Sequence, residues 1–188
     1  MLLGIIYNFI MGLMSENADQ IIDRLWVGNY KSPLDISFLR QNNIQVIVNC
    51  TPDVPFHTDV YSPDQIADLK IETFRIPVYD SLLEKDILLM EEYLKLVIPF
   101  LIRKYVIEKK NILINCVAGA QRSAIVCAAL LNVLVERGIV DIPGVRVEAD
   151  KSKQFKKIRE YMLSRRPRVF LYGASVNFDK SYRRFFNY

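Results

Sequence analysis

The residues in this chain whose types and spacing best suit chemistry are a cysteine and an arginine six positions apart, Cys116 and Arg122. Small or neutral residues lie between them, among them Gly119, and an apolar run typical of a buried strand precedes them. An apolar-periodic helix is predicted to start at about Arg122. A strand, a short loop and a helix N-terminus in this order direct backbone N–H groups and the positive end of the helix dipole at one point, which favours the binding of an anion.

A cysteine in such a loop is expected to ionise easily. A helix N-terminus and a neighbouring arginine lower the pKa of a cysteine thiol from about 8.5 into the range of about 3.5–7.5, because both stabilise the thiolate. Cys116 is therefore predicted to be an easily ionised thiol beside a bound anion. The residues predicted to line that anion are those of the loop itself: Val117, Ala118, Gly119, Ala120, Gln121 and Arg122.

The elements that must position this loop alternate along the chain between strands and helices. The pattern predicts strands over residues 21–27, 44–49, 71–78 and 112–114, and helices over residues 32–40, 84–101, 122–137, 148–165 and 176–186. Ser32 is expected to cap the first helix, and Pro99 to kink or split the second. The alternation is typical of an α/β fold with a mainly parallel central sheet flanked by helices.

Two chemically useful residues follow predicted strands of this sheet. Asp80 comes after the strand over residues 71–78, and Cys116 follows the strand over residues 112–114. In open parallel sheets, ligands bind outside the carboxyl ends of the strands. Both side chains are therefore expected at the edge of the sheet where a ligand would bind.

The composition limits the other kinds of site. The chain has 188 residues, of which 51% are hydrophobic, and is long enough to bury a core without disulfides or metals. A net charge of +4 is too small for a dedicated nucleic-acid-binding protein. Three cysteines without CxxC spacing and a single histidine argue against a zinc or His-rich metal site. We expect no cofactor, no metal and a reducing compartment, the cytoplasm or the nucleus.

The chain begins with an apolar stretch. Its first 14 residues carry no charge, but they are too few for a transmembrane helix and lack the basic start and cleavage site of a signal peptide. We therefore separate an apolar N-terminal segment, residues 1–20, from a domain over residues 21–188. Two interpretations of the segment stay open: it packs on its own domain, or it docks on a partner, on another copy to form a homodimer, or on a membrane surface.

The loop resembles the phosphate-binding signature of the cysteine-dependent dual-specificity protein phosphatases, members of the protein tyrosine phosphatase superfamily. That signature is written His-Cys-x-x-Gly-x-x-Arg-Ser/Thr, and Cys116, Gly119, Arg122 and Ser123 match it. The resemblance extends over residues 21 to 186, and is carried by the stretches 24–28, 75–80 and 165–167. One position departs from the signature: the family's histidine is Asn115, whose amide cannot carry a positive charge. We expect activity to survive, with a higher thiol pKa.

The resemblance implies a two-step reaction without a metal. Cys116 would attack phosphorus and form a phosphocysteine, while Arg122 would hold two equatorial phosphate oxygens. Asp80 would protonate the leaving oxygen and then act as the base on the hydrolytic water. Ser123 would hydrogen-bond the sulfur and improve it as a leaving group. The other candidate acids are Asp86, Asp59 and Asp53.

Several other residues admit two interpretations. Cys50, at a strand end, is either a core cysteine or the partner of a protective disulfide with Cys116, whereas Cys127 is expected in the core. His57 is expected at the surface. The basic cluster Arg165, Arg166 and Arg168 is either a solvated helix end or a second phosphate site. The lysines of the 148–165 helix are expected to form a solvated face.

The function that these observations favour is removal of phosphate from phosphotyrosine and from phosphoserine or phosphothreonine in a protein substrate. A lipid or RNA phosphatase of the same fold is an alternative, although the loop side chains Val117, Ala118, Ala120 and Gln121 are neutral. A phosphoprotein-binding pseudophosphatase is another, which Asn115 makes more plausible. A rhodanese-like sulfur transferase also presents a cysteine in an anion loop, but it has no use for Asp80 or Ser123.

Overall fold

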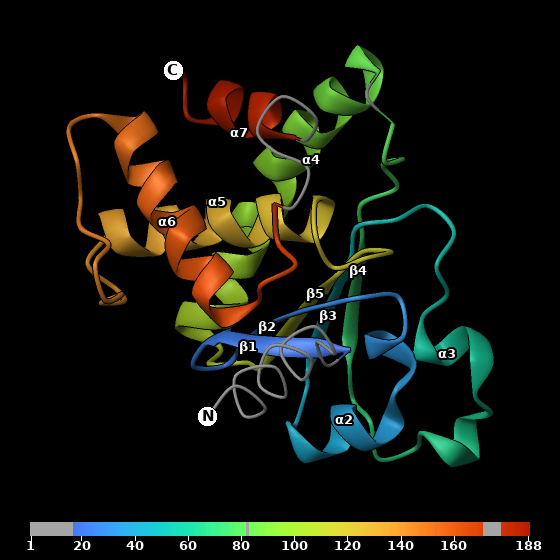
Figure 1. Ribbon diagram of the computed structural model, residues 1–188. Coiled ribbons are helices and arrows are strands. Elements are labelled where there is room, and N and C mark those ends of the chain that lie inside the picture. The colour runs from blue at the N-terminus through green and yellow to red at the C-terminus, as the bar shows by residue number, and fades with distance from the viewer. Residues whose placement is uncertain (1–16, 82, 171–177) are drawn as a thin grey trace, which may run out of the picture.

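A five-stranded sheet forms the centre of the fold. The computed structural model describes residues 17–81, 83–170 and 178–188, and within them the strand order is β1-β2-β5-β3-β4 (Figure 1). Only the β1–β2 pair is antiparallel in this described part, which confirms the expected mainly parallel sheet. The strands are β1 (Ala18–Ile22), β2 (Leu25–Gly28), β3 (Val46–Asn49), β4 (Glu72–Arg75) and β5 (Ile112–Asn115).

The predicted single strand over residues 21–27 is wrong, because a hairpin turn divides it. β1 and β2 are joined through Asp23 and Arg24, and Arg24 adopts a left-handed backbone conformation with φ of 58°. Two-residue hairpin turns use such positive φ values. β1 begins at Ala18, so it includes the last three residues of the predicted N-terminal segment, residues 1–20. Residues 1–16 of that segment lie outside the described residues.

Helices follow the strands much as the periodicity predicted. They are η1 (Ser32–Leu34), α2 (Ile36–Gln41), α3 (His57–Val60), η2 (Pro63–Gln65), α4 (Glu84–Ile102), the π-helical turn η3 (Arg103–Ile107), α5 (Arg122–Glu136), α6 (Lys151–Arg165) and α7 (Asp179–Phe185). None of the helices within the described ranges is long and apolar enough to cross a membrane.

Three local predictions need correction. The 32–40 helix starts later, because Asp35 caps α2 by accepting the Phe38 N–H at 3.0 Å, whereas the Ser32 hydroxyl donates to a backbone carbonyl of the preceding turn. Pro99 does not split α4, which continues through it to Ile102. His57 is buried at the start of α3 rather than exposed, and this burial lowers its pKa.

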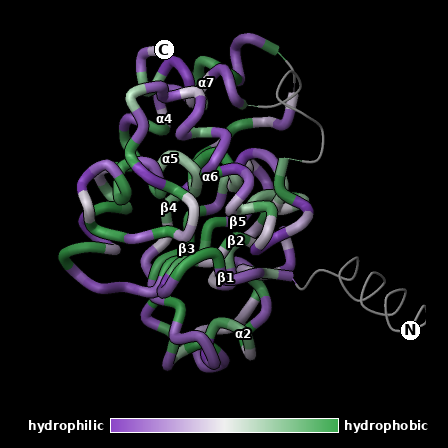
Figure 2. Tube along the Cα trace, turned by 60° about the vertical axis from the view of Figure 1, so that its left-hand side comes forward, coloured by the Kyte–Doolittle hydropathy of each residue, from purple (hydrophilic) through white to green (hydrophobic). Residues whose placement is uncertain are grey.

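Helices cover both faces of the sheet. In each buried strand, alternate side chains enter two separate cores. Leu25, Val27, Ile112 and Ile114 pack with α4, α5 and α6, whereas Trp26 and Leu113 pack with α2. Figure 1 shows α4, α5, α6 and α7 on one side of the sheet and α2 and α3 on the other, and Figure 2 shows the hydrophobic stretches gathered at the centre.

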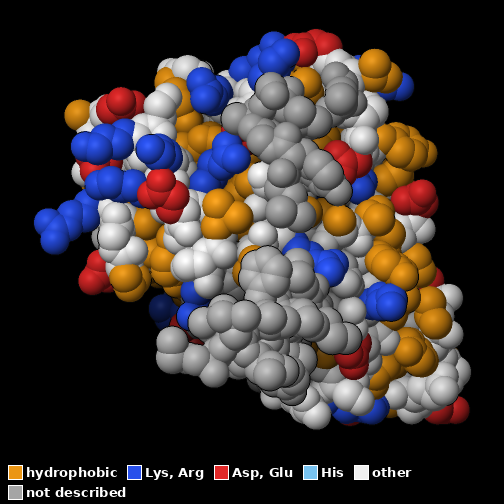
Figure 3. Space-filling model, in the orientation of Figure 1, with side chains coloured by type: hydrophobic (Ala, Val, Ile, Leu, Met, Phe, Trp, Pro, Cys, Tyr) orange, Lys and Arg blue, Asp and Glu red, His pale blue; other side chains and the backbone are white. Residues whose placement is uncertain are grey.

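The central helix α5 is buried along nearly its whole length. It lies between the sheet and the helices α4 and α6, which accounts for its almost continuous apolar sequence. Cys127 belongs to this core, as expected, and burial raises its pKa. The α6 lysines lie mainly toward solvent, where Figure 3 shows the Lys and Arg side chains at the left of the molecule. The fold thus holds the first turn of α5 rigidly against the end of β5.

Candidate active site

Cys116 lies at the carboxyl edge of the sheet, as predicted. β5 is flanked by β2 and β3, and its last residue, Asn115, is in register with Gly28 and Asn49. The Cys116 N–H donates to the Gly28 carbonyl at 3.3 Å. The strand therefore delivers the cysteine to the start of the loop with its backbone already fixed.

The loop turns back over β2 through Gly119. This glycine has φ of +66°, a conformation that side chains strongly disfavour. A Cβ at this position would also lie 2.6 Å from the Gly28 carbonyl oxygen. At the start of the loop, the Tyr30 N–H donates to the Val117 carbonyl at 3.0 Å. The glycine of the sequence motif is thus required both by the backbone conformation and by the close approach of β2.

The sulfur of Cys116 is buried among hydrogen-bond donors. The Ser123 hydroxyl oxygen lies 3.2 Å from Sγ. Burial alone would raise the pKa of the thiol, but the positive charge of Arg122, the Ser123 hydroxyl and the N–H groups of Ser123 and Ala120 outweigh it. The pKa of Cys116 is therefore lowered below its ordinary value, in the direction that the sequence predicts.

Arg122 is the first residue of α5 and is itself buried. Its Nη1 donates to the Val78 carbonyl at 2.8 Å, which ties the guanidinium to the segment that follows β4. Its Nε lies 3.7 Å from Oδ2 of Asp80 and has no hydrogen-bond partner within the described part of the chain. The Asp80 side chain is 41% exposed, so its carboxylate lies at the mouth of the site. The fold therefore brings together three predicted residues from two separate strand ends.

The other candidate acids have different positions. The Asp86 carboxylate is buried and accepts a hydrogen bond from Ser81, while the Asp59 carboxylate caps α3 by accepting the Phe56 N–H. Asp53 is exposed in the loop after β3. Among these four acids, Asp80 is the one paired with Arg122.

Asn115, which stands where the signature has histidine, is a buried polar residue whose side chain lacks hydrogen-bond partners within the described residues. Asn115 is fully buried, and neither its amide oxygen nor its amide nitrogen has a hydrogen-bond partner among the described residues. The Gln121 amide, directly before Arg122, is buried in the same way. Asn115 therefore shows no direct hydrogen bond that would support the thiolate.

Sequence reasoning missed two residues that support the loop. Arg166 is not at a solvated helix end: it is fully buried and its Nε donates to the Gly119 carbonyl at 2.9 Å. Its Nη1 forms an ion pair with Asp19 of β1. Nothing in the basic cluster 165–168 singled out Arg166, and Asp19 precedes the predicted domain boundary.

Cys50 lies beside the nucleophile. It follows β3, and its N–H donates to the Asn115 carbonyl at 2.7 Å, so Cys50 and Cys116 are neighbours across two parallel strands. Both thiols are free. Burial, together with the nearby Cys116, raises the pKa of Cys50 well above its usual range. The protective disulfide is therefore not formed in this structure, and its formation on oxidation stays a prediction.

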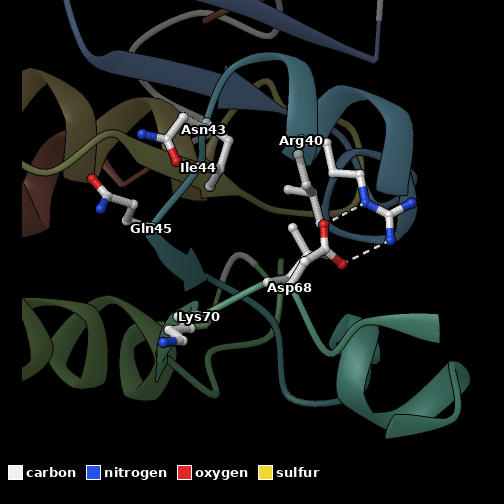
Figure 4. Close-up of a pocket in the computed structure, with 8 residues that line it drawn as sticks. Arg40, Asn43, Ile44, Gln45, Asp68 and Lys70 are labelled. Carbon is white, nitrogen blue, oxygen red and sulfur yellow. Dashed lines mark hydrogen bonds and ion pairs between the residues drawn. The ribbon is translucent and has the colours of Figure 1, made fainter. Parts of the chain in front are cut away.

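A hollow of about 410 Å³ lies elsewhere, at the amino ends of β3 and β4 (Figure 4). The Arg40 guanidinium and the Asp68 carboxylate form two hydrogen bonds of 2.8 Å beside it. Because Cys116 follows the carboxyl end of β5, this hollow is at the opposite edge of the sheet. It takes no part in the arrangement around the cysteine. The described residues also contain no group of three or more His, Cys, Asp or Glu side chains placed to hold a metal ion.

Comparisons with known proteins agree with this fold. A family model described as "Dual specificity phosphatase, catalytic domain" matches residues 25–133. No curated protein matches the chain.

Similar solved structures come from several organisms. A mouse protein assigned as a dual specificity phosphatase and solved with zinc tungstate has 20% identity and a TM-score of 0.63, covering 92% of this chain and 90% of that chain. The Yvh1 phosphatase domain from Chaetomium thermophilum has 14% identity and a TM-score of 0.65, covering 90% and 95%. A human tyrosine phosphatase-like serine/threonine/tyrosine-interacting protein has 16% identity and a TM-score of 0.62, also covering 90% and 95%. These similarities show the fold.

Proposed function

Since this chain belongs to the family of dual specificity phosphatase catalytic domains, we propose that it hydrolyses phosphotyrosine and phosphoserine or phosphothreonine in proteins through a phosphocysteine intermediate. The observation that carries the proposal is that three groups lie together at one edge of the sheet: the Cys116 thiol with its lowered pKa, the buried guanidinium of Arg122 and the carboxylate of Asp80. Each of these groups has a role in the two chemical steps.

In the first step, the Cys116 thiolate attacks phosphorus and an S–P bond forms as the P–O bond to the protein side chain breaks. Arg122 carries its charge next to the sulfur, where it would hold two of the equatorial phosphate oxygens. Its buried Nε, which has no hydrogen-bond partner within the described residues, is available as one of the two donors. Protonated Asp80 gives its proton to the leaving oxygen, so that the protein leaves as a neutral hydroxyl.

In the second step, water hydrolyses the phosphocysteine. Asp80, now a carboxylate, takes a proton from the water as the water oxygen bonds to phosphorus and the S–P bond breaks. The electron pair returns to sulfur as a thiolate. The Ser123 hydroxyl, 3.2 Å from Sγ, donates to that thiolate and makes it a better leaving group.

A second candidate is a phosphoprotein-binding pseudophosphatase, and one observation favours it. Asn115 replaces the signature histidine, and its side-chain amide makes no hydrogen bond within the described residues. The phosphate-holding groups Arg122 and the loop N–H groups would serve binding as well as turnover. In that case the chain would bind a phosphopeptide without releasing phosphate.

The deciding experiment measures release of inorganic phosphate from phosphotyrosine, phosphoserine and phosphothreonine peptides in the presence of EDTA. We expect turnover by the natural chain and none by Cys116→Ser. Cys127→Ala is the matched control, because it alters another buried cysteine that lies in the core of α5 and should retain activity. Binding of phosphopeptide without turnover would support the pseudophosphatase. Preferential turnover of a phosphoinositide or an RNA 5′-phosphate would instead support a lipid or RNA phosphatase.

A further inference from the structure

The peptide group between Gly119 and Ala120 connects two buried side chains. In a trans peptide, the C=O and N–H bonds point in opposite directions, and the described residues contain no cis peptide. The Gly119 carbonyl accepts a hydrogen bond from Arg166 Nε at 2.9 Å. The N–H on the other side of the same peptide, that of Ala120, is one of the groups that lower the pKa of Cys116. Arg166 and the sulfur therefore lie at the two ends of one peptide dipole.

Arg166 is held in place from several directions. It lies directly after α6, its Nη1 pairs with Asp19 of β1, and its Nη2 is 3.5 Å from the Ala118 carbonyl. A buried guanidinium needs a paired charge and satisfied donors to be tolerated. Gly119 makes room for it, because a Cβ there would lie 2.6 Å from Nη2. The site behind the loop is therefore built for an arginine.

We propose that Arg166, oriented by Asp19, is a positioning residue that fixes the Gly119–Ala120 peptide with its N–H toward Cys116 and so stabilises the ionised sulfur. The guanidinium also polarises the peptide, since a charged donor on the carbonyl strengthens the N–H as a donor. The role goes beyond the four residues of the proposed mechanism. It rests on the proposed function only in taking Cys116 as the nucleophile.

Other groups around the sulfur set the baseline for its ionisation. Arg122 contributes a positive charge from α5, and Asp80 lies beyond it at the mouth of the site. Cys50, on the neighbouring strand β3, stays a neutral thiol because its own pKa is raised. Variants of Arg166 or Asp19 leave all of these groups in place, so a change in Cys116 ionisation reports on the peptide behind the loop.

The test measures the rate of Cys116 alkylation by iodoacetamide against pH in the full chain, with the modified peptide identified by mass spectrometry. Asp19→Asn and Arg166→Lys each disturb the pairing, because an amide carries no charge and an ammonium cannot reproduce the guanidinium fork. We expect the midpoint of alkylation to rise by about one pH unit in each variant, which means about tenfold less thiolate at a pH below the midpoint.

Arg165→Lys is the matched control. Arg165 is the neighbouring residue, and its Nε donates at 3.2 Å to the Gln20 carbonyl on the same strand β1, whereas within the described part of the chain no hydrogen bond or ion pair joins it to the loop. Its replacement should leave the midpoint unchanged. Circular dichroism at each pH establishes that every variant is folded; if Arg166→Lys fails this check, Asp19→Asn alone decides.

Two results would overturn the proposal: an unchanged midpoint in folded Asp19→Asn, or an equal rise in Arg165→Lys. Because alkylation needs no phosphate ester, the readout is separate from turnover. A natural chain that releases no phosphate, but whose alkylation midpoint rises in Asp19→Asn, would contradict the proposed function and support the positioning role.

Discussion

Removing the Ser123 hydroxyl tests how much one neutral donor contributes to the acidity of Cys116. In Ser123→Ala, the Oγ that lies 3.2 Å from the sulfur is lost. Both residues are buried, so bulk water does not readily replace the missing donor. A hydrogen bond to a charged group contributes about 1.5–3 kcal/mol. At about 1.4 kcal/mol per unit, the pKa of Cys116 should rise by about 1–2 units.

The same variant should change the pH dependence of stability. The pKa of Cys116 is lowered in the folded chain relative to the unfolded chain, where it is about 8.5. A lowered pKa contributes stability that is complete above the unfolded value and is lost as the pH falls through the folded value. The free energy of unfolding lost in Ser123→Ala should therefore be largest above about pH 8.5 and should shrink as the pH falls below the folded pKa. Below the folded pKa the sulfur is a neutral thiol, so the variant loses only a neutral hydrogen bond, which contributes about 1 kcal/mol.

Two assays measure these effects. Alkylation of Cys116 against pH gives the thiol midpoint, and urea unfolding at pH 6 and pH 9 gives the stability difference. Ser123→Thr keeps a hydroxyl and should restore a low midpoint. Hydrolysis of p-nitrophenyl phosphate by Ser123→Ala should show a burst of one equivalent, because a poorer leaving thiolate makes the phosphocysteine accumulate. A midpoint within 0.3 units of the natural chain, in a folded variant, would refute the reasoning.

Three further predictions concern the neighbours of this sulfur. Asp80→Asn should lower kcat by about 10²–10⁴-fold, whereas Asp86→Asn should have a much smaller effect; a near-normal kcat in Asp80→Asn would exclude Asp80 as the acid. Asn115→His should lower the alkylation midpoint of Cys116, because an imidazolium can stabilise the thiolate, and superimposable curves would show that this position does not matter. Hydrogen peroxide should convert the Cys116 thiolate to a sulfenic acid, which condenses with the Cys50 thiol to a disulfide and releases water. Dithiothreitol should then restore activity in the natural chain but not in Cys50→Ala, and equal recovery would contradict the pairing.

The parts of the site that sequence reasoning could predict are local ones. Cys116, Gly119 and Arg122 lie within seven consecutive residues, and the strand and helix that flank them have clear apolar periods. The position of Asp80 after a strand was also enough to place it at the correct edge of the sheet. These inferences needed only the direction of the strands and the spacing along the chain.

The parts that could not be predicted depend on contacts between distant segments. Arg166 looked like one of several arginines at a helix end, and only the path of the chain shows that it is buried against Gly119, 47 positions earlier. The turn at Arg24 was hidden because apolar residues continue on both sides of it. Pro99 is tolerated inside α4, where its local preference is overridden by a helix whose apolar face packs into the core.

The Asp19–Arg166 ion pair joins residues 147 positions apart, and this separation bears on how the protein is made. A ribosome releases Asp19 first, then Cys116 with its loop, and Arg166 last. Contacts between distant positions also form late in folding, because a long segment of chain must close before they can be made. If Arg166 has the proposed role, a growing chain that contains Cys116 but not yet Arg166 lacks this contribution, and the pKa of its Cys116 thiol is closer to the ordinary value. The thiol would then reach its full acidity only after residue 166 has emerged, and at a pH below its midpoint the unfinished chain would carry about tenfold less thiolate.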